Sequence, residues 1–216
     1  TEAAERAIKL ARIYGETFEP RRTLIIGSEG NFHGKTMGAQ LVGGQEDGKH
    51  WIGFRDPNMA HLPFPYPWVT EPSGKTGAAL FHEHVDALTR AGHDPTRAAA
   101  FLVESFQGWG TLFYPQDYIE EMRRFSAAHR VLLIFDEIQG GFGRTGRLFA
   151  YQHYGVEPDL VICGKSISSS LPLSAVLGRA ELIDLDPAYT STHGGHPLAC
   201  AAGLANLEVL ERENLI

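Results

Sequence analysis

The chain has 216 residues, of which 43% are hydrophobic and 21% charged, as expected of a folded domain with a sizeable core. A formal net charge of −7 and a pI near 5.8 argue against a nucleic-acid-binding surface, which is normally basic. No apolar stretch approaches the ~20 residues of a membrane span, and two cysteines are too few for a disulfide framework. We therefore expect a cytoplasmic protein that binds neither nucleic acid nor a membrane.

The first half of the chain predicts one helix, one strand and a long loop region. Apolar residues recur with helical spacing over residues 1–12, and the pattern ends near Gly15. Thr23–Ile26 is a short apolar run that predicts a strand, and a glycine-broken loop follows it. Residues 43–77 contain five prolines together with glycines and aromatic residues. This composition predicts a long, ordered excursion without regular structure.

The second half predicts a regular alternation of helices and strands. The helices are expected at residues 78–91, 117–129 and 197–213. The strands are expected at residues 99–103, 131–135, 160–163 and 174–177. Such alternation is typical of an α/β domain in which helices cover both faces of a mostly parallel sheet.

Two of these strands end in residues that carry chemistry. Val131–Phe135 runs directly into Asp136, and Leu160–Cys163 is followed by Gly164 and Lys165. Parallel sheets bind ligands at the carboxyl ends of their strands, so we expect Asp136 and Lys165 to share one crevice. An amine and a carboxylate there suit pyridoxal phosphate (PLP), because lysine forms a Schiff base with its aldehyde and aspartate pairs with its pyridinium. The uncharged residues after Lys165 predict partial desolvation of its amine, which favours this chemistry.

Other motifs weigh less. Gly141–Gly146 fits the G-x-G-x-x-G pattern of a dinucleotide-dependent oxidoreductase, but Asp136–Gln139 separates it from the strand. Gly164–Ser166 looks like the end of a Walker A loop, yet the first glycine of such a loop would fall on Asp159. The paired histidines have no cysteine or carboxylate at metal-ligand spacing, so we predict no metal site.

Four segments in order resemble the class III PLP-dependent aminotransferases of fold type I, the group of ornithine, acetylornithine and 4-aminobutyrate aminotransferases. They are Asn31–Thr36, Asp136–Gly146, Pro158–Lys165 and Thr192–Ala199. The resemblance implies a three-layer large domain with a mostly parallel sheet. Residues 1–216 would form part of this PLP-binding domain, without an N-terminal segment and a small C-terminal domain.

The resemblance also implies residue roles. Lys165 would form the Schiff base and then move a proton between the substrate Cα and the cofactor. Asp136 would keep the pyridine nitrogen protonated, because an anion raises the pKa of that nitrogen. Gln139 would hydrogen-bond the phenolic oxygen of the cofactor, and Phe32 and Ile138 would pack against its two ring faces. For Phe32, packing in the core is the alternative.

The remaining implied roles concern the rim of the site. His33 would lie beside the ring, and Glu104 would lie near the cofactor, with a structural role as the alternative. Thr1 would bind the phosphate at the start of the first helix, and a plain N-cap role there is compatible with this. Thr192 would reach the same phosphate from a neighbouring subunit, which implies a homodimer with shared active sites.

The reaction implied is transfer of an amino group from an amine or amino acid, often an omega-amino one, to a 2-oxo acid in two ping-pong halves. A racemase or aminomutase on the same scaffold would use the same residues and stays open, as does a catalytically silent PLP-binding protein. Trp109 stands where ornithine-type members have a glutamate. Its indole predicts either an apolar lining for the substrate or a core side chain.

Overall fold

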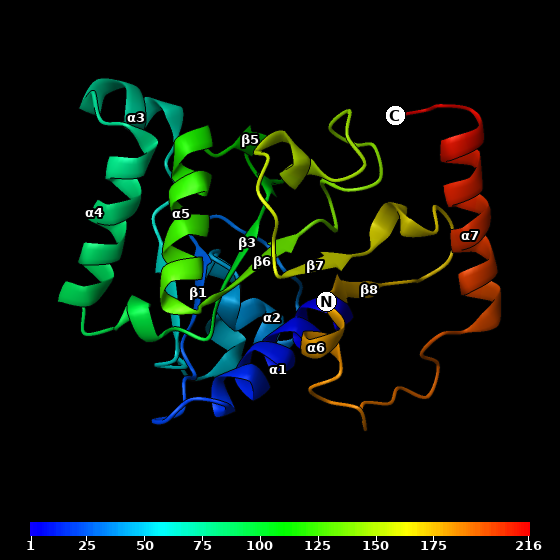
Figure 1. Cartoon of the computed structure of the whole chain (residues 1–216), viewed down its shortest axis with the longest axis horizontal. Helices are drawn as coiled ribbons and strands as arrows, with labels where there is room; N and C mark the ends of the chain where they lie inside the picture. The colour runs from blue at the N-terminus through cyan, green and yellow to red at the C-terminus, as the bar shows by residue number, and fades with distance from the viewer.

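The computed structural model describes all of residues 1–216. The fold is built on a six-stranded sheet (Figure 1). The strand order is β2-β1-β3-β6-β7-β8, and every pair is parallel except β7 with β8, which is antiparallel. The predicted mostly parallel sheet is therefore confirmed. The strands are Ile25–Ser28 (β1), Met59–Leu62 (β2), Ala100–Glu104 (β3), Leu132–Asp136 (β6), Leu160–Cys163 (β7) and Ala175–Gly178 (β8).

Helices cover both faces of this sheet and complete three layers (Figure 1). Side chains of α4 and α5 pack with Phe101 and Phe135 on one face. Side chains of α1, α2 and α6 pack with Leu102 and Ile134 on the other face. Neighbouring strand residues alternate between the two cores because side chains along a strand point to opposite faces. The helices are Glu2–Glu16 (α1), Met37–Val42 (α2), Gly77–Arg90 (α4), Gln116–His129 (α5) and Ala180–Ile183 (α6).

The stretch predicted to be irregular contains regular structure, so that prediction is wrong in part. Met59–Leu62 forms edge strand β2, and Pro67–Ser73 forms helix α3. Helix α2 at Met37–Val42 was not predicted either. Strand β2 has four residues of alternating partial and full burial and pairs only with β1. Its conformation depends on that partner more than on its own sequence.

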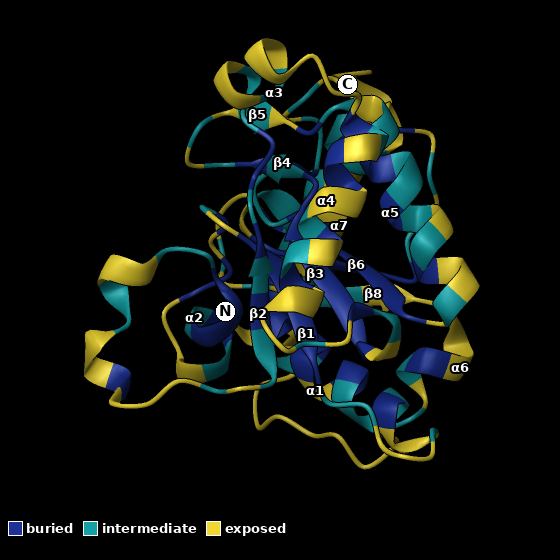
Figure 2. Ribbon diagram, turned by 90° about the vertical axis from the view of Figure 1, so that its left-hand side faces the viewer, coloured by how far each residue is buried: buried dark blue, intermediate teal, exposed yellow.

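The remaining elements lie at the periphery. A small antiparallel hairpin, β4 (Phe106–Gln107) and β5 (Leu112–Phe113), follows β3 directly. Helix α7 (Pro197–Arg212) lies at one edge of the molecule (Figure 1), with only two buried residues. Burial is concentrated in the central strands and in the helix faces turned to them (Figure 2). No helix has both the length and the apolar character needed to cross a membrane.

Candidate active site

The carboxyl edge of the sheet gathers the predicted polar side chains. Glu104 is the last residue of β3 and Asp136 the last of β6, and the two are paired in the parallel register. Lys165 follows the neighbouring strand β7 by two residues. The prediction that Asp136 and Lys165 emerge at one edge of the sheet is confirmed.

A cavity of about 720 Å³ opens at this edge. Eight of the nine residues predicted to bind a cofactor line it: Thr1, Phe32, His33, Glu104, Asp136, Ile138, Gln139 and Lys165. Thr192 is exposed and is absent from the lining, although its neighbours Ser191 and His193 belong to it. Within one chain the structure thus brings together every predicted position except Thr192, whose contact with a partner subunit stays a prediction.

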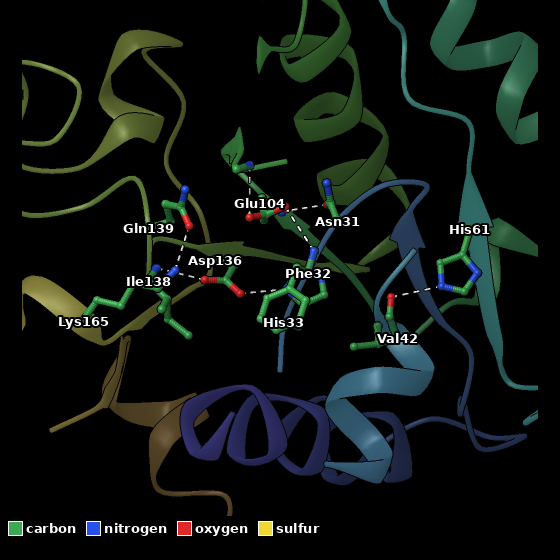
Figure 3. A network of polar contacts seen from close by, with 11 residues as sticks. Asn31, Phe32, His33, Val42, His61, Glu104, Asp136, Ile138, Gln139 and Lys165 are labelled. Carbon is green, nitrogen blue, oxygen red and sulfur yellow. Dashed lines mark hydrogen bonds and ion pairs between the residues drawn. The ribbon is translucent and has the colours of Figure 1, made fainter. Parts of the chain in front are cut away.

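Asp136 is a fixed carboxylate in this cavity (Figure 3). Its side chain is 3% exposed, and its Oδ2 lies 2.7 Å from His33 Nδ1. Its Oδ1 accepts a hydrogen bond from the backbone N–H of Ile138 at 2.9 Å. The His33 ring is fully buried, and its Nε2 has no partner. Two contacts thus orient the carboxylate before any ligand arrives, which gives a preorganised anion.

Lys165 begins a short 3-10 helix, Lys165–Ile167, two residues after the end of β7. Its Nζ donates to Gln139 Oε1 at 2.7 Å (Figure 3), and its backbone has a φ of 41°, in the left-handed region. The residue is exposed, so the prediction of partial desolvation is wrong for this chain. The turn projects the side chain into the open cavity instead of against the sheet. Lys165 and Gln139 also line an adjoining cavity of about 750 Å³ with Phe106 and Arg144 among its other residues.

Glu104 is a buried carboxylate whose two oxygens both face backbone N–H groups. Oε2 accepts from Phe32 at 3.1 Å, and Oε1 accepts from Gly108 at 3.3 Å. Burial raises the pKa of Glu104 to about 7, the nearby His33 opposes this rise, and Asp136 adds to it. The carboxyl group therefore changes charge near neutral pH.

One end of the cavity is suited to an anion. Thr1 is the N-cap residue of helix α1, and its side chain makes no capping hydrogen bond, so its hydroxyl is not used by the helix itself. Gly34 has a φ of 141°, and a Cβ at this position would lie 2.4 Å from Thr1 Oγ1. Glycine therefore permits the close approach of the two segments. Backbone N–H groups at a helix start attract anions such as phosphate.

The structure decides several alternatives that the sequence left open. Phe32 is 41% exposed, so it is not a core side chain. Trp109 is 78% exposed in the turn between β4 and β5, so it is not a core side chain either. Gly141–Gly146 lies in turns, and the element after it is a short 3-10 turn, Ala150–His153, rather than the long helix of a dinucleotide site.

Sequence reasoning missed residues that support the site from behind. Asn31 is fully buried, and its Oδ1 accepts from the backbone N–H of Glu104 at 2.9 Å. Gly108 lies directly against Gln139, since a Cβ there would be 3.0 Å from Gln139 Cδ. Asn31 belongs to a segment that the sequence had already marked, but its role depends on a strand 73 residues away.

Comparisons with known proteins agree with this geometry. The profile of the family "Aminotransferase class-III" matches residues 1–216. The chain is 37% identical to ornithine aminotransferase of Emericella nidulans, with 100% of the chain and 47% of that protein covered. It is 38% identical to 2-aminoadipate transaminase of Pseudomonas putida, with 99% and 50% covered. The chain belongs to the class-III aminotransferase family and spans about half the length of these curated relatives.

Solved structures show the same fold. A thermostable (S)-enantioselective omega-transaminase from Thermomicrobium roseum has a TM-score of 0.87 and 34% identity, over 99% of this chain and 50% of that one. An amine transaminase from an uncultivated Pseudomonas species, in its PLP-bound form, has a TM-score of 0.86 and 31% identity, over 99% and 51%. The predicted three-layer PLP-transferase fold is thereby confirmed.

Proposed function

We propose that the protein containing this chain is a PLP-dependent aminotransferase that moves an amino group from an amine or amino acid to a 2-oxo acid. The observation that carries this proposal is that the buried carboxylate of Asp136 and the side chain of Lys165 line the same cavity. Membership of the class-III aminotransferases supports it. The PLP-bound form of the amine transaminase from an uncultivated Pseudomonas species supports the choice of cofactor.

The lining of the cavity fits PLP at three points. The start of α1, with Thr1 and Gly34, suits the phosphate. Asp136 suits the ring nitrogen, and Lys165 suits the aldehyde. When bound, PLP supplies an aldehyde that condenses with amines and a protonated ring that withdraws electrons from the substrate.

Each residue then has a task that follows from its contacts. Asp136 holds a proton on the ring nitrogen, because a fixed anion raises the pKa of that nitrogen. The contact with His33 keeps the Asp136 carboxylate oriented. Lys165 moves a proton at the substrate Cα as a general base and acid, and Gln139 orients its amine. Phe32 and Ile138 line the cavity and would cover the ring.

The alternatives differ in their products. A racemase or aminomutase would use the same lysine and aspartate, but the relatives named above are transaminases and give this alternative no support. A stoichiometric 2-oxo acid product from an amino donor, followed by amination of a second 2-oxo acid, would support transamination. Loss of chirality without amino transfer would contradict it. No turnover despite bound PLP would revive the silent PLP-binding alternative.

The proposal includes a homodimer in which Thr192 of one copy serves the site of the other. Two observations motivate this arrangement. Thr192 is exposed and does not line the cavity of its own chain, whereas its neighbours Ser191 and His193 do. Coexpression of Lys165→Ala and Thr192→Ala subunits tests this arrangement. If the sites are shared, a hybrid dimer has one intact site and regains activity. If Thr192 acts within its own chain, every site of the hybrid carries one defect.

The cytoplasmic setting also stays a prediction.

Reductive trapping tests the cofactor assignment. The full protein is incubated with PLP and reduced with borohydride, and the modified lysine is mapped by peptide mass spectrometry. This chain contains five lysines: Lys9, Lys35, Lys49, Lys75 and Lys165. We expect the pyridoxyl adduct on Lys165, its loss in Lys165→Ala and its retention in the control Lys35→Ala. An unmodified Lys165 in folded, PLP-saturated protein would sink the proposal.

A further inference from the structure

Glu104 connects two segments that approach the cavity from different parts of the chain. Its Oε2 accepts from the backbone N–H of Phe32 at 3.1 Å, and its own N–H donates to Asn31 Oδ1 at 2.9 Å (Figure 3). Its Oε1 accepts from Gly108, in the turn of the β4–β5 hairpin, at 3.3 Å. Both carboxylate oxygens thus accept a hydrogen bond, and the residue is 4% exposed. We call these contacts of Glu104 with Phe32 and Gly108, which join the loop to the hairpin, the clasp.

The hairpin side of this clasp leads on to the lysine. A Cβ at position 108 would lie 3.0 Å from both Cδ and Nε2 of Gln139, so Gly108 lies directly against that carboxamide. Gln139 Oε1 in turn accepts from Lys165 Nζ at 2.7 Å. An unbroken path of contacts therefore runs from the Phe32 loop through Glu104, Gly108 and Gln139 to the amine.

We propose that Glu104 is a positioning residue, which holds the Gly108 turn in place so that Gln139 keeps the Lys165 amine oriented toward the bound cofactor and substrate. The inference rests on the proposed aminotransferase function. It assigns Glu104 no direct chemistry, because the path to the amine runs through two other residues. Groups that act through contact chains of this kind affect the reaction rate more than substrate affinity, since orientation decides the barrier.

The charge of Glu104 adds to this role. His33 and Asp136 face it from the neighbouring loop and strand, and the phenol of Tyr114 lies within its field. With a pKa raised to about 7 by burial, Glu104 becomes an anion as the pH rises through neutrality. An ionised carboxylate is the stronger acceptor for both backbone N–H groups. The two hydrogen bonds therefore strengthen as Glu104 ionises, while burial of the new charge lowers the stability of the fold.

Glu137 provides a matched control for a merely structural role. It is fully buried, and like Glu104 it accepts from two backbone N–H groups, those of Ala150 and Tyr151, both at 2.8 Å. A hydrogen bond from Ser105 completes its environment, and it does not line the cavity. Loss of a buried acceptor in general would therefore affect Glu137→Gln and Glu104→Gln alike.

The experiment compares Glu104→Gln, Gly108→Ala and Glu137→Gln in the full, PLP-loaded protein. Its readouts are kcat, KM and the pH midpoint of the visible absorption change of the cofactor, with thermal melting as a folding check. Gln at 104 replaces one acceptor by a donor. Ala at 108 leaves the Glu104 side chain unchanged and displaces Gln139 instead. The backbone of Gly108 lies outside the left-handed region, so alanine can adopt it.

We expect Glu104→Gln and Gly108→Ala to lower kcat roughly 10-fold or more, with KM little changed, and to move the absorption midpoint in the same direction. Glu137→Gln should lower the melting temperature but keep the wild-type midpoint. Wild-type behaviour of Glu104→Gln and Gly108→Ala, or an equal shift in Glu137→Gln, would overturn the clasp while leaving the proposed function intact. A wild-type protein that binds no PLP would overturn the proposed function first.

Discussion

Asp136 and Glu137 are adjacent acids, both almost fully buried, yet they lie in two different regions of the protein. Asp136 faces the cavity and contacts His33 and the N–H of Ile138. Glu137 faces the interior, where Ser105 and two backbone N–H groups after position 149 surround it. The chain at this point is still extended, since the Glu137 N–H continues the ladder to β7, so consecutive side chains point to opposite sides.

The difference shows that burial and charge do not by themselves identify a functional carboxylate. The Glu137 carboxylate accepts three hydrogen bonds from the protein and does not face the cavity, so it does not contact a ligand there. Asp136 has one side-chain contact, with a histidine whose other nitrogen is unpartnered. A cavity-facing acid should therefore control activity, and an interior acid should control stability.

Asp136→Asn tests the cavity side and should have the largest effect. The amide is nearly isosteric but cannot stabilise a positive charge on the cofactor ring, so kcat should fall roughly 100- to 1,000-fold. The unfolding midpoint in urea should change little. An Asp136→Asn enzyme with near wild-type turnover would remove the distinction between the two acids.

Glu137→Ala tests the interior side. It leaves Ser105 Oγ and the N–H groups of Ala150 and Tyr151 without their acceptor, which should lower the free energy of unfolding by about 3 kcal/mol. The turnover of the folded fraction should stay near that of wild type. Denaturant unfolding and active-site titration of the same sample separate the two quantities. A strong loss of turnover per titrated site would contradict the comparison.

Glu104 lies between these cases, because it is structural in its contacts yet lines the cavity. Its pKa in the folded protein, about 7, exceeds its ordinary 4.5, so the folded state holds the proton more tightly. Its contribution to stability is therefore full below about pH 4.5 and is lost as the pH rises through about 7, by no more than about 3 kcal/mol. Urea unfolding of Glu104→Gln between pH 5 and pH 8 should show a weaker pH dependence than wild type. An unchanged slope would argue against this titration.

Trp109→Ala should have the smallest effect on stability. It tests whether the turn of the β4–β5 hairpin contributes to substrate binding. Its exposure of 78% predicts a change in unfolding free energy within about 0.5 kcal/mol. If its indole contacts the substrate, kcat/KM for aromatic amines should fall roughly 10-fold and that for small amines should not. Trp68→Ala, which removes another exposed indole from α3, is the control. Equal losses for both amine classes would contradict a role in specificity.

The chemistry of the site could be predicted because it follows the ends of strands. Apolar runs before Asp136 and Lys165 are visible in one sequence, and the geometry of parallel sheets places their ends together. Glu104 likewise ends a strand, but its place near the cofactor was implied by the family resemblance. The longer helices and strands after residue 77 were predicted to within a few residues, because buried strands and amphipathic helices have distinct periods. The β4–β5 hairpin and helix α6 were not predicted.

The rest depends on partners that no local pattern encodes. Strand β2 exists because β1 lies beside it, and its four residues are embedded in a segment rich in proline and glycine. The contact of His33 with Asp136 joins residues 103 positions apart, and the bond of Asn31 to Glu104 joins residues 73 apart. The exposure of Lys165 follows from a turn whose backbone geometry its flanking sequence does not announce.

The left-handed backbone at Lys165 places its proposed function and the stability of the fold in opposition at a single residue. A φ of 41° is unfavourable for any side chain with a Cβ, by about 1 kcal/mol or more relative to glycine. Selection for stability alone would therefore favour glycine at this position. The proposed Schiff-base role of Lys165 would account for a lysine at a backbone position that glycine would occupy at lower cost.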